Sequence, residues 1–322
     1  MNLLVTSVGR RVKIIEYFKR ALKELDRKVI AADCDPKAPA LYFADNYEIV
    51  PQINSENYIS YILQVCKKHN IKGIVSLIDP ELEILAKNKE KFEKVGIKLI
   101  LSPLQMVQNS FDKKETYRYL EELSIPAVPT MDNYEEVVSF IEQEKYEFPL
   151  VVKPKKGSAS NGLFFVYNIE ELKQAFFNSP NMIIQPFYKD REFGIDIYID
   201  MVSGNLVDMF IKEKILMRAG ETDKSISVNN REIEKIVSDF VRKANFLGPI
   251  DIDCFEKDGK YYISEINPRF GGGYPHAFEM GCNFMEYIVT NLNGRKNNDY
   301  TGFKYSEGYV MMKYDDVKIF KQ

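Results

Sequence analysis

Two neighbouring segments near the C-terminal end combine the apolar pattern of buried strands with acidic side chains. Residues 250–255 and 260–266 flank a Lys-Asp-Gly turn, which predicts a β-hairpin. Asp253 lies on the first strand and Glu265 on the second, and Asn267 shares the face of Glu265 because side chains alternate along a strand. A hairpin that buries carboxylates must offer them a cation or an ion-pair partner, because an isolated buried charge is costly.

Two carboxylates and one amide oxygen form a donor set that suits Mg²⁺, which commonly keeps water and phosphate oxygens as its other ligands. The pattern therefore predicts a metal site at Asp253, Glu265 and Asn267. Asp251 lies on the same face as Asp253 and is the rival first ligand. An ion pair with Arg269 is the alternative explanation of these acidic residues.

The first third of the chain alternates strand-like and helix-like segments. Short apolar runs predict strands at residues 2–6, 28–32, 73–78 and 97–101. Helical spacing of apolar residues predicts helices at 12–25, 58–69 and 80–95. This alternation predicts a parallel sheet, whose ligands bind at the carboxyl ends of the strands. Later segments, such as 193–200 and 206–212, have the alternation of antiparallel strands, so the expected fold is an α/β domain followed by an α+β region.

The loop after the first strand contains Gly9, Arg10 and Arg11. A dinucleotide fingerprint requires three glycines, so a nicotinamide site is not expected here. Two arginines at the start of a helix suit an anionic group, and a solvated helix start explains them equally well.

A loop rich in small residues follows the apolar strand 148–154, which carries Lys153 near its end. Gly157 and Gly162 have the spacing of a P-loop, but leucine and phenylalanine follow Gly162 where lysine and serine or threonine are required. Backbone N–H groups of such a loop can bind phosphates, and a plain hairpin turn is the alternative.

Composition excludes several function classes. The 322 residues carry a formal net charge of −3, which argues against nucleic acid as the main partner. No apolar stretch approaches the ~18 residues of a membrane span, and the N-terminus lacks the apolar region of a signal peptide. The four cysteines are scattered, as in reduced proteins, so a cytoplasmic location is expected.

Four stretches in this order resemble the ATP-grasp superfamily. They are Asp112-Lys113, Val152-Lys153-Pro154 with the glycine-rich loop, Gln185-Pro186-Phe187 with Glu192, and Asp253 with Glu265-Ile266-Asn267-Pro268-Arg269. The N-terminal segment with residues 77–82 is similar to the domain that precedes the grasp in carbamoyl-phosphate-synthase-like members. The resemblance implies a pre-ATP-grasp domain at 1–110, a lid subdomain at 111–185 and a metal-binding C-terminal subdomain at 186–322.

The resemblance also implies roles for individual residues. Lys113 and Lys153 would contact ATP phosphates, and Arg269 would stabilise the transferred phosphate. Gln185 and Phe187 would line the adenine site and Glu192 would hold the ribose. The phosphate-covering loop would use Lys155, Gly157, Ser158 and Gly162. The metal set of Asp253, Glu265 and Asn267 would hold one or two Mg²⁺ ions, with Mn²⁺ as an expected substitute.

The implied reaction is a ligation in which ATP activates a carboxylate as an acyl-phosphate and an amine then attacks it. One alternative is an enzyme of the carboxylase or carbamoyl-phosphate type that uses bicarbonate, and another is a nucleotide-binding module without turnover. The chain is too short for a doubled synthase, so one ATP site is expected. The expected partners are a small carboxylate and a small amine. Homodimers are the commonest oligomers, so a homodimer is the assembly to test.

The acceptor site is expected near two glycine-containing segments. Residues 212–222 are predicted as a charged loop between a strand and a helix, in which Arg218 could bind a substrate carboxylate, with a solvated loop as the alternative. Residues 271–273 are glycines that would let a substrate approach the backbone. His276 follows, and a structural role is favoured over that of a base.

Overall fold

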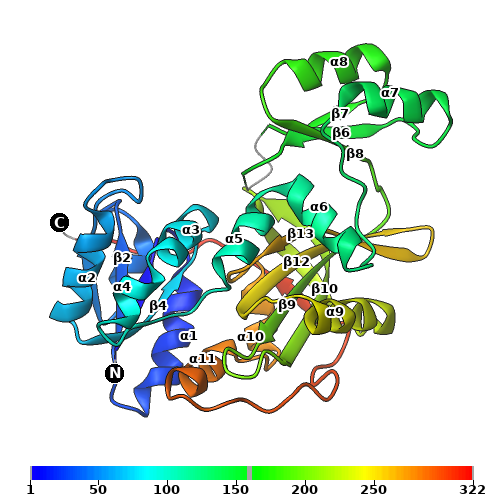
Figure 1. Ribbon diagram of the computed structural model, residues 1–322. Coiled ribbons are helices and arrows are strands. Elements are labelled where there is room, and N and C mark those ends of the chain that lie inside the picture. Colours follow the sequence, from blue (N-terminus) through cyan, green and yellow to red (C-terminus); the bar gives the residue numbers. More distant parts are fainter. Residues whose placement is uncertain (1, 158–161, 321–322) are drawn as a thin grey trace.

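The N-terminal unit is built on a parallel five-stranded sheet with the order β3-β2-β1-β4-β5 (Figure 1). The structure, a computed structural model, describes residues 2–157 and 162–320. The strands are β1 (Asn2–Thr6), β2 (Val29–Asp33), β3 (Asn46–Ile49), β4 (Ile71–Ser76) and β5 (Lys98–Leu99). The helices are α1 (Val12–Lys23), α2 (Tyr58–Lys68), α3 (Asp79–Lys87) and α4 (Lys89–Glu93), with a 3-10 helix η1 (Pro39–Phe43).

Alternating side chains of the central strand join two different cores. Leu3 and Val5 pack with α1 and with α11 (Phe284–Leu292), whereas Leu4 packs with α2 and α3 on the other face. The sheet is therefore covered on both faces, as parallel sheets are. The predicted helix at 80–95 is two helices, because the chain leaves the helical conformation at Asn88. Strand β3 was not predicted from the sequence, because it is short and largely exposed.

A three-stranded antiparallel sheet with two helices forms a separate lobe at the top of Figure 1. Its elements are α7 (Tyr134–Glu142), β6 (Leu150–Pro154), β7 (Phe164–Val166), α8 (Ile169–Phe177) and β8 (Met182–Pro186). Its apolar side chains form their own core, to which α7 contributes Val137 and α8 contributes Leu172. We call residues 131–187 the lid lobe.

The lid subdomain is predicted at 111–185, and the first part of this range packs outside the lid lobe. The helix α6 (Lys113–Glu122) places Leu120 in the core of the six-stranded sheet described below, which we call the large sheet, and not in the core of the lid lobe. The physical reason is the apolar face of α6, which continues into Ile125 and packs beneath the large sheet. The preceding helix α5 (Leu104–Phe111) links the N-terminal unit to this region.

The remaining body is a six-stranded antiparallel sheet with the order β13-β12-β9-β10-β11-β14. Its strands are β9 (Glu192–Ile199), β10 (Leu206–Arg218), β11 (Glu221–Ser227), β12 (Gly248–Lys257), β13 (Lys260–Asn267) and β14 (Val310–Met312). Its helices are α9 (Arg231–Lys243), α10 (Tyr274–Glu279) and α11. The expected fold class, a parallel α/β domain followed by an α+β region with a lid, is confirmed.

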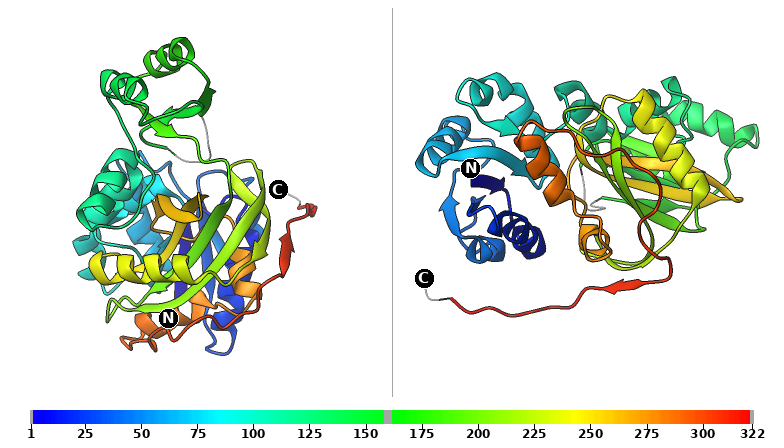
Figure 2. Two further views of the ribbon diagram at one scale, coloured as in Figure 1. Left: turned by 90° about the vertical axis from the view of Figure 1, so that its right-hand side faces the viewer. Right: turned by 90° about the horizontal axis from the view of Figure 1, so that it is seen from below.

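The C-terminal segment crosses from β14 to the N-terminal unit (Figure 2, right view). The ring of Phe320 stacks on Tyr42, with 4.3 Å between ring centroids. No helix in the described ranges has both the length and the apolar sequence that a membrane crossing requires.

Candidate functional site

One face of the large sheet carries a row of charged side chains. In the register of the β12–β13 pair, Asp253 lies opposite Glu265 and Asp251 lies opposite Asn267. Asp196 of β9 is the partner of Asp251 on the other side of β12. The intervening isoleucines face the opposite way into the core, so the period of two that patterns these strands also gathers the acids on one face.

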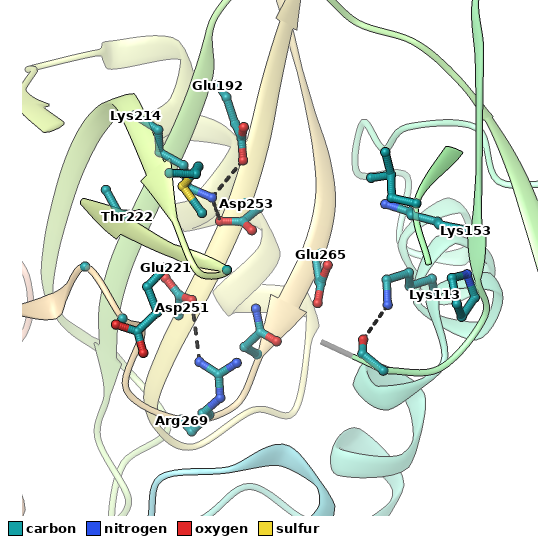
Figure 3. A pocket seen from close by; sticks show the side chains of 18 of the residues that line it. Lys113, Lys153, Glu192, Lys214, Glu221, Thr222, Asp251, Asp253, Glu265 and Arg269 are labelled. Carbon is teal, nitrogen blue, oxygen red and sulfur yellow. Dashed lines mark hydrogen bonds and ion pairs between the residues drawn. The ribbon is translucent and has the colours of Figure 1, made fainter. Parts of the chain in front are cut away.

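Of this row, Asp251, Asp253, Glu265 and Asn267 line a cleft between the large sheet, the lid lobe and the first loop of the N-terminal unit. Figure 3 shows Lys113 and Lys153 on one side, Glu265 pointing into the space between, and Glu221, Asp251 and Arg269 on the other side. The residues that line the cleft are Arg11, Lys113, Lys153, Pro154, Lys156, Gly157, Leu163, Glu192, Lys214, Met217, Gly220, Glu221, Thr222, Asp251, Asp253, Glu265, Asn267, Arg269, Gly272 and Gly273.

The two predicted phosphate lysines reach the cleft from different elements. Asp112 caps α6 by accepting hydrogen bonds from two backbone N–H groups of the first turn, which fixes Lys113 at the start of the helix. The Nζ of Lys113 donates to the carbonyl of Gly157 at 2.7 Å. Lys153 extends from the end of β6 toward Glu265. Burial lowers the pKa of Lys153, and the attraction of Glu265 offsets part of this effect.

Lys214 is a cleft residue that the sequence analysis missed. Its Nζ donates to Oδ1 of Asp253 at 2.6 Å and to Oε1 of Glu192 at 2.7 Å. Burial lowers the pKa of Lys214, but the attraction of Asp253 and Glu192 outweighs burial and raises the pKa above its ordinary value. The predicted loop at 212–222 is wrong, because β10 continues to Arg218 and turns directly into β11. The spacing of Lys212 and Lys214, two residues apart, was the sequence signal that indicated a strand with both lysines on one face.

A buried ion pair lies beneath this group. The Nζ of Lys212 donates to Oδ2 of Asp196, and both side chains are almost completely buried. A Cβ on Gly273 would lie 2.6 Å from Cε of Lys212, so only glycine leaves room for that lysine. Burial and the negative charges of Asp253 and Asp196 raise the pKa of Asp251 to about 7.

Arg269 joins the large sheet to the N-terminal unit. Its Nη2 donates to Oδ2 of Asp79 at 2.9 Å, and its Nη1 lies 3.7 Å from Oδ2 of Asp251. Burial lowers the pKa of Arg269, but Asp79 and Asp251 outweigh it, so the pKa is raised. The ion pairs of Arg269 in the structure are therefore with Asp79 and Asp251, and not with Asp253 or Glu265.

Several predicted site residues lie outside the lining of the cleft. The Nε2 of Gln185 donates to Oγ1 of Thr130 at 2.7 Å, and Gln185 is buried. The ring of Phe187 contacts Phe165 on the lid lobe, with 5.0 Å between centroids. Lys155 lies 3.2 Å from a carboxylate oxygen of Asp132.

Gly162 and Ser158 are the two other loop residues that were predicted to cover the phosphates. Gly162 lies against Pro154, since a Cβ added to it would be 3.2 Å from Cγ of the proline. Ser158 lies outside the described residues.

The structure does not bring Arg218 to the cleft. Its Nε donates to Asp223 at 2.8 Å and its Nη1 donates to Asp315 at 3.0 Å. The side chain of Arg218 is at the last position of β10 and is about half exposed. The expected contact with a substrate carboxylate therefore has no geometric support, because two protein carboxylates already hold the guanidinium group.

His276 has the structural role that the sequence analysis favoured. Its Nδ1 lies 2.8 Å from Oγ of Ser225, and its ring packs against Phe210. Burial and the charge of Lys212 lower the pKa of His276 to about 4. The ring is therefore uncharged at neutral pH and is held in the core.

The donor set fits a hard divalent cation that shares its ligands with phosphate. Among residues 2–157 and 162–320, no group of three or more His, Cys, Asp and Glu side chains is arranged to hold a metal ion. Asp253 and Glu265 supply two carboxylates on facing strands, and Asn267 adds an amide oxygen. Mg²⁺ sites with one or two carboxylates are completed by phosphate oxygens and water, so this set fits Mg²⁺ bound together with a nucleotide.

Comparison with protein families decides the classification. The model of the ATP-grasp domain matches residues 110–273, which is half of the chain, and the model of the PylC-like N-terminal domain matches residues 3–100. The chain belongs to the ATP-grasp family. The resemblance inferred from the four sequence stretches is confirmed.

Individual relatives of this ATP-grasp protein are distant. One subunit of the pyruvate carboxylase of Methanothermobacter thermautotrophicus is 25% identical over 298 residues, covering 83% of this chain and 59% of the relative, so the chain spans less than two thirds of that relative. The D-alanine--D-alanine ligase of Fervidobacterium nodosum is 25% identical over 249 residues, covering 68% of this chain and 78% of the relative.

A solved structure shows the same fold over nearly the whole chain. It is the biotin carboxylase domain dimer of 2-oxoglutarate carboxylase from Hydrogenobacter thermophilus, in complex with MgADP, ADP and bicarbonate. The TM-score is 0.76 at 14% identity, and the match covers 96% of this chain and 73% of the other.

Proposed function

We propose that this ATP-grasp protein is an ATP- and Mg²⁺-dependent ligase that activates a small carboxylate as an acyl-phosphate for attack by a small amine, releasing ADP and phosphate. The observation that carries the proposal is the arrangement around Glu265. Lys113 and Lys153 lie on the lid side of this carboxylate, and Arg269 lies on the other side (Figure 3). The cations on both sides can balance the negative charge of a polyphosphate, and the carboxylates between them can bind the metal ion that accompanies it.

The contacts support specific roles. Lys113 and Lys153 bind phosphate oxygens, and Asp253, Glu265 and Asn267 hold one or two Mg²⁺ ions. Bound Mg²⁺ neutralises charge on the phosphates as the phosphoryl group is transferred. Lys214 holds the carboxylates of Asp253 and Glu192 in place, at 2.6 and 2.7 Å.

The other assignments remain part of the proposal. Arg269 stabilises the transferred phosphate, and Glu192 holds the ribose. Gln185 and Phe187 bound the adenine site, while the loop with Lys155, Gly157, Ser158 and Gly162 covers the phosphates. Arg218 is omitted from the catalytic group because its two carboxylate partners occupy it.

A bicarbonate-using enzyme is the second candidate. It is favoured by the names of two relatives, one of them part of a pyruvate carboxylase and the other a 2-oxoglutarate carboxylase domain that was solved with bicarbonate. The first candidate is favoured by the D-alanine--D-alanine ligase, because this chain covers 78% of that relative and only 59% of the pyruvate carboxylase subunit. The solved carboxylase domain is described as a dimer, which supports a homodimer as the proposed assembly, and a cytoplasmic location is proposed with it.

A screen for ADP release tests the proposed function. The protein is incubated with ATP, Mg²⁺ and pooled pairs of carboxylates and amines, and ADP is measured with a coupled assay. We expect ADP formation that requires one carboxylate and one amine together. Release that depends on bicarbonate would favour the second candidate, and nucleotide binding with no release in any pool would contradict both.

Replacement of Lys153 tests the nucleotide site separately from turnover. Lys153→Ala should weaken ATP binding by about tenfold or more, because a charge-assisted contact to phosphate is lost. Isothermal titration calorimetry with a non-hydrolysable ATP analogue measures this effect. Lys173→Ala is the matched control, since Lys173 is exposed on α8 of the same lobe. Equal affinities of Lys153→Ala and wild type would contradict the assignment.

A further inference from the structure

A second charged group lies across the cleft from Lys113 and Lys153. Glu221 begins β11, and its Oε1 lies 3.4 Å from Nη2 of Arg10 and 3.3 Å from Nε of Arg11. Its Oε2 accepts a hydrogen bond from Nζ of Lys313 at 3.0 Å. Three cations therefore share one carboxylate.

The arginines are incompletely compensated by this carboxylate. A charge-assisted N–H···O bond typically spans about 2.7–2.9 Å, which is shorter than either arginine distance to Glu221. Arg11 is mostly buried, and its Nη1 donates only to a neutral partner, the carbonyl of Phe270, at 3.1 Å. Burial and repulsion by Arg269 lower the pKa of Arg11, and the attraction of Glu221, Asp251 and Asp79 offsets only part of this effect.

Two members of this group, Arg11 and Glu221, line the same cleft as the metal-binding set. Arg11, Glu221 and Gly272 all line the cleft together with Glu265. A Cβ on Gly272 would lie 2.6 Å from Cγ of Glu221, so the absence of a side chain there lets Glu221 pack against the backbone. Arg10 and Lys313 are not among the lining residues and adjoin the cleft through Glu221. Glu221 lies across the cleft from Lys113 and Lys153 (Figure 3).

Three distant segments of the chain meet at this point. The arginines come from the loop after β1, and Glu221 is the first residue of β11. Lys313 comes from the segment 313–320, which we call the C-terminal strap. The strap is fixed at its far end by Lys318, whose Nζ lies 4.4 Å from the ring centroid of Phe43. Figure 2 shows the strap reaching the N-terminal unit. Lys313 directly follows β14, and its backbone N–H donates to the carbonyl of Asp223 at 3.0 Å, which holds it beside β11.

We propose that Arg10, Arg11 and Lys313 form an anion subsite that binds a carboxylate or phosphate group of the substrate other than the group that reacts. A mostly buried cation such as Arg11 is stabilised by an anionic ligand, and arginine binds carboxylate and phosphate with paired N–H donors. The substrate class is thus a carboxylate or an amine that carries an additional anionic group. Its role as a substrate subsite rests on the proposed function, whereas the binding of an anion does not.

Anion binding is measured directly, without turnover. The protein is saturated with Mg²⁺ and a non-hydrolysable ATP analogue, which fills the γ-phosphate position, and is then titrated calorimetrically with inorganic phosphate or with succinate. We expect saturable binding of at least one anion. Phosphate binding alone indicates a phosphorylated substrate, and succinate binding alone indicates a substrate with a second carboxylate.

Variants with opposite expected effects locate the binding. Arg11→Met and Lys313→Met should each weaken binding by about tenfold, because each removes a charged donor. Glu221→Gln should strengthen binding several-fold, because it removes the competing carboxylate while keeping the shape of the side chain. A purely structural role for Glu221 gives no such gain. Lys13→Met is the matched control, since Lys13 is an exposed residue of α1 close to the arginines and pairs only with Glu16 among the described residues, so this variant should bind as wild type does.

Two results would overturn the subsite. One is the absence of saturable anion binding by the wild-type chain with and without nucleotide. The other is unchanged anion affinity in both Arg11→Met and Lys313→Met. The titration without nucleotide gives a result even if no nucleotide binds, so failure of the proposed function and failure of the subsite are distinguishable.

Discussion

Replacement of Glu265 by glutamine should lower the rate of ADP release by at least about a hundredfold while nucleotide affinity changes little. The carboxylate of Glu265 points into the cleft, and no ion pair joins it to any residue that the structure describes. Glutamine keeps the shape but removes the charge that would hold the metal ion. A bound metal ion can stabilise the transition state by several kcal/mol. Each 1.36 kcal/mol of activation free energy changes the rate tenfold, so losing this stabilisation accounts for a hundredfold lower rate.

The matched control is Glu256→Gln in the neighbouring strand. Glu256 lies 2.7 Å from Nη2 of Arg191 and is not among the residues that line the cleft. Its replacement should leave ADP release within about twofold of wild type, since the lost contact is a partly exposed ion pair. ADP release that is equally fast in Glu265→Gln and wild type would contradict the metal assignment.

Removal of Asp196 should produce the largest loss of stability among single substitutions in this sheet. Asp196→Ala leaves the buried ammonium of Lys212 without its partner, and breaking a buried pair in this way costs about 3–5 kcal/mol. Denaturant unfolding measured by circular dichroism reports the change. Glu93→Ala, which breaks an exposed pair with Lys89, should unfold at the wild-type midpoint.

The double variant Asp196→Ala/Lys212→Met separates charge from packing. Removing both charges relieves the unpaired lysine, so the double variant should recover much of the stability that Asp196→Ala loses. A double variant that is less stable than Asp196→Ala would show that the pair contributes mainly through packing.

The positions of the metal-binding candidates could be predicted because they depend on local periodicity. Alternation along two strands and a short turn determine that Asp253 and Glu265 share a face, and the register agrees. The parallel pairing of the N-terminal strands was also predictable, since strands that alternate with helices admit few topologies.

The other half of the cleft depends on contacts between distant segments. Lys214 was missed because a charged stretch with a glycine resembles a loop, whereas pairing with β9 and β11 extends the strand to Arg218. Lys313 is 92 residues away from Glu221, so no local pattern links them. Arg218 was expected to bind a substrate carboxylate or to be solvated, and its ion pair with Asp315 could not be foreseen because that partner is 97 residues away.

Transfer of oxygen-18 tests the central claim most directly. The carboxylate found by the ADP-release screen is labelled with oxygen-18 in its carboxyl group, and the released phosphate is analysed by mass spectrometry. A ligase that forms an acyl-phosphate transfers one labelled oxygen from the carboxylate to each phosphate released with ADP. Unlabelled phosphate, released at the rate of product formation, would contradict the proposal that the protein activates the carboxylate as an acyl-phosphate.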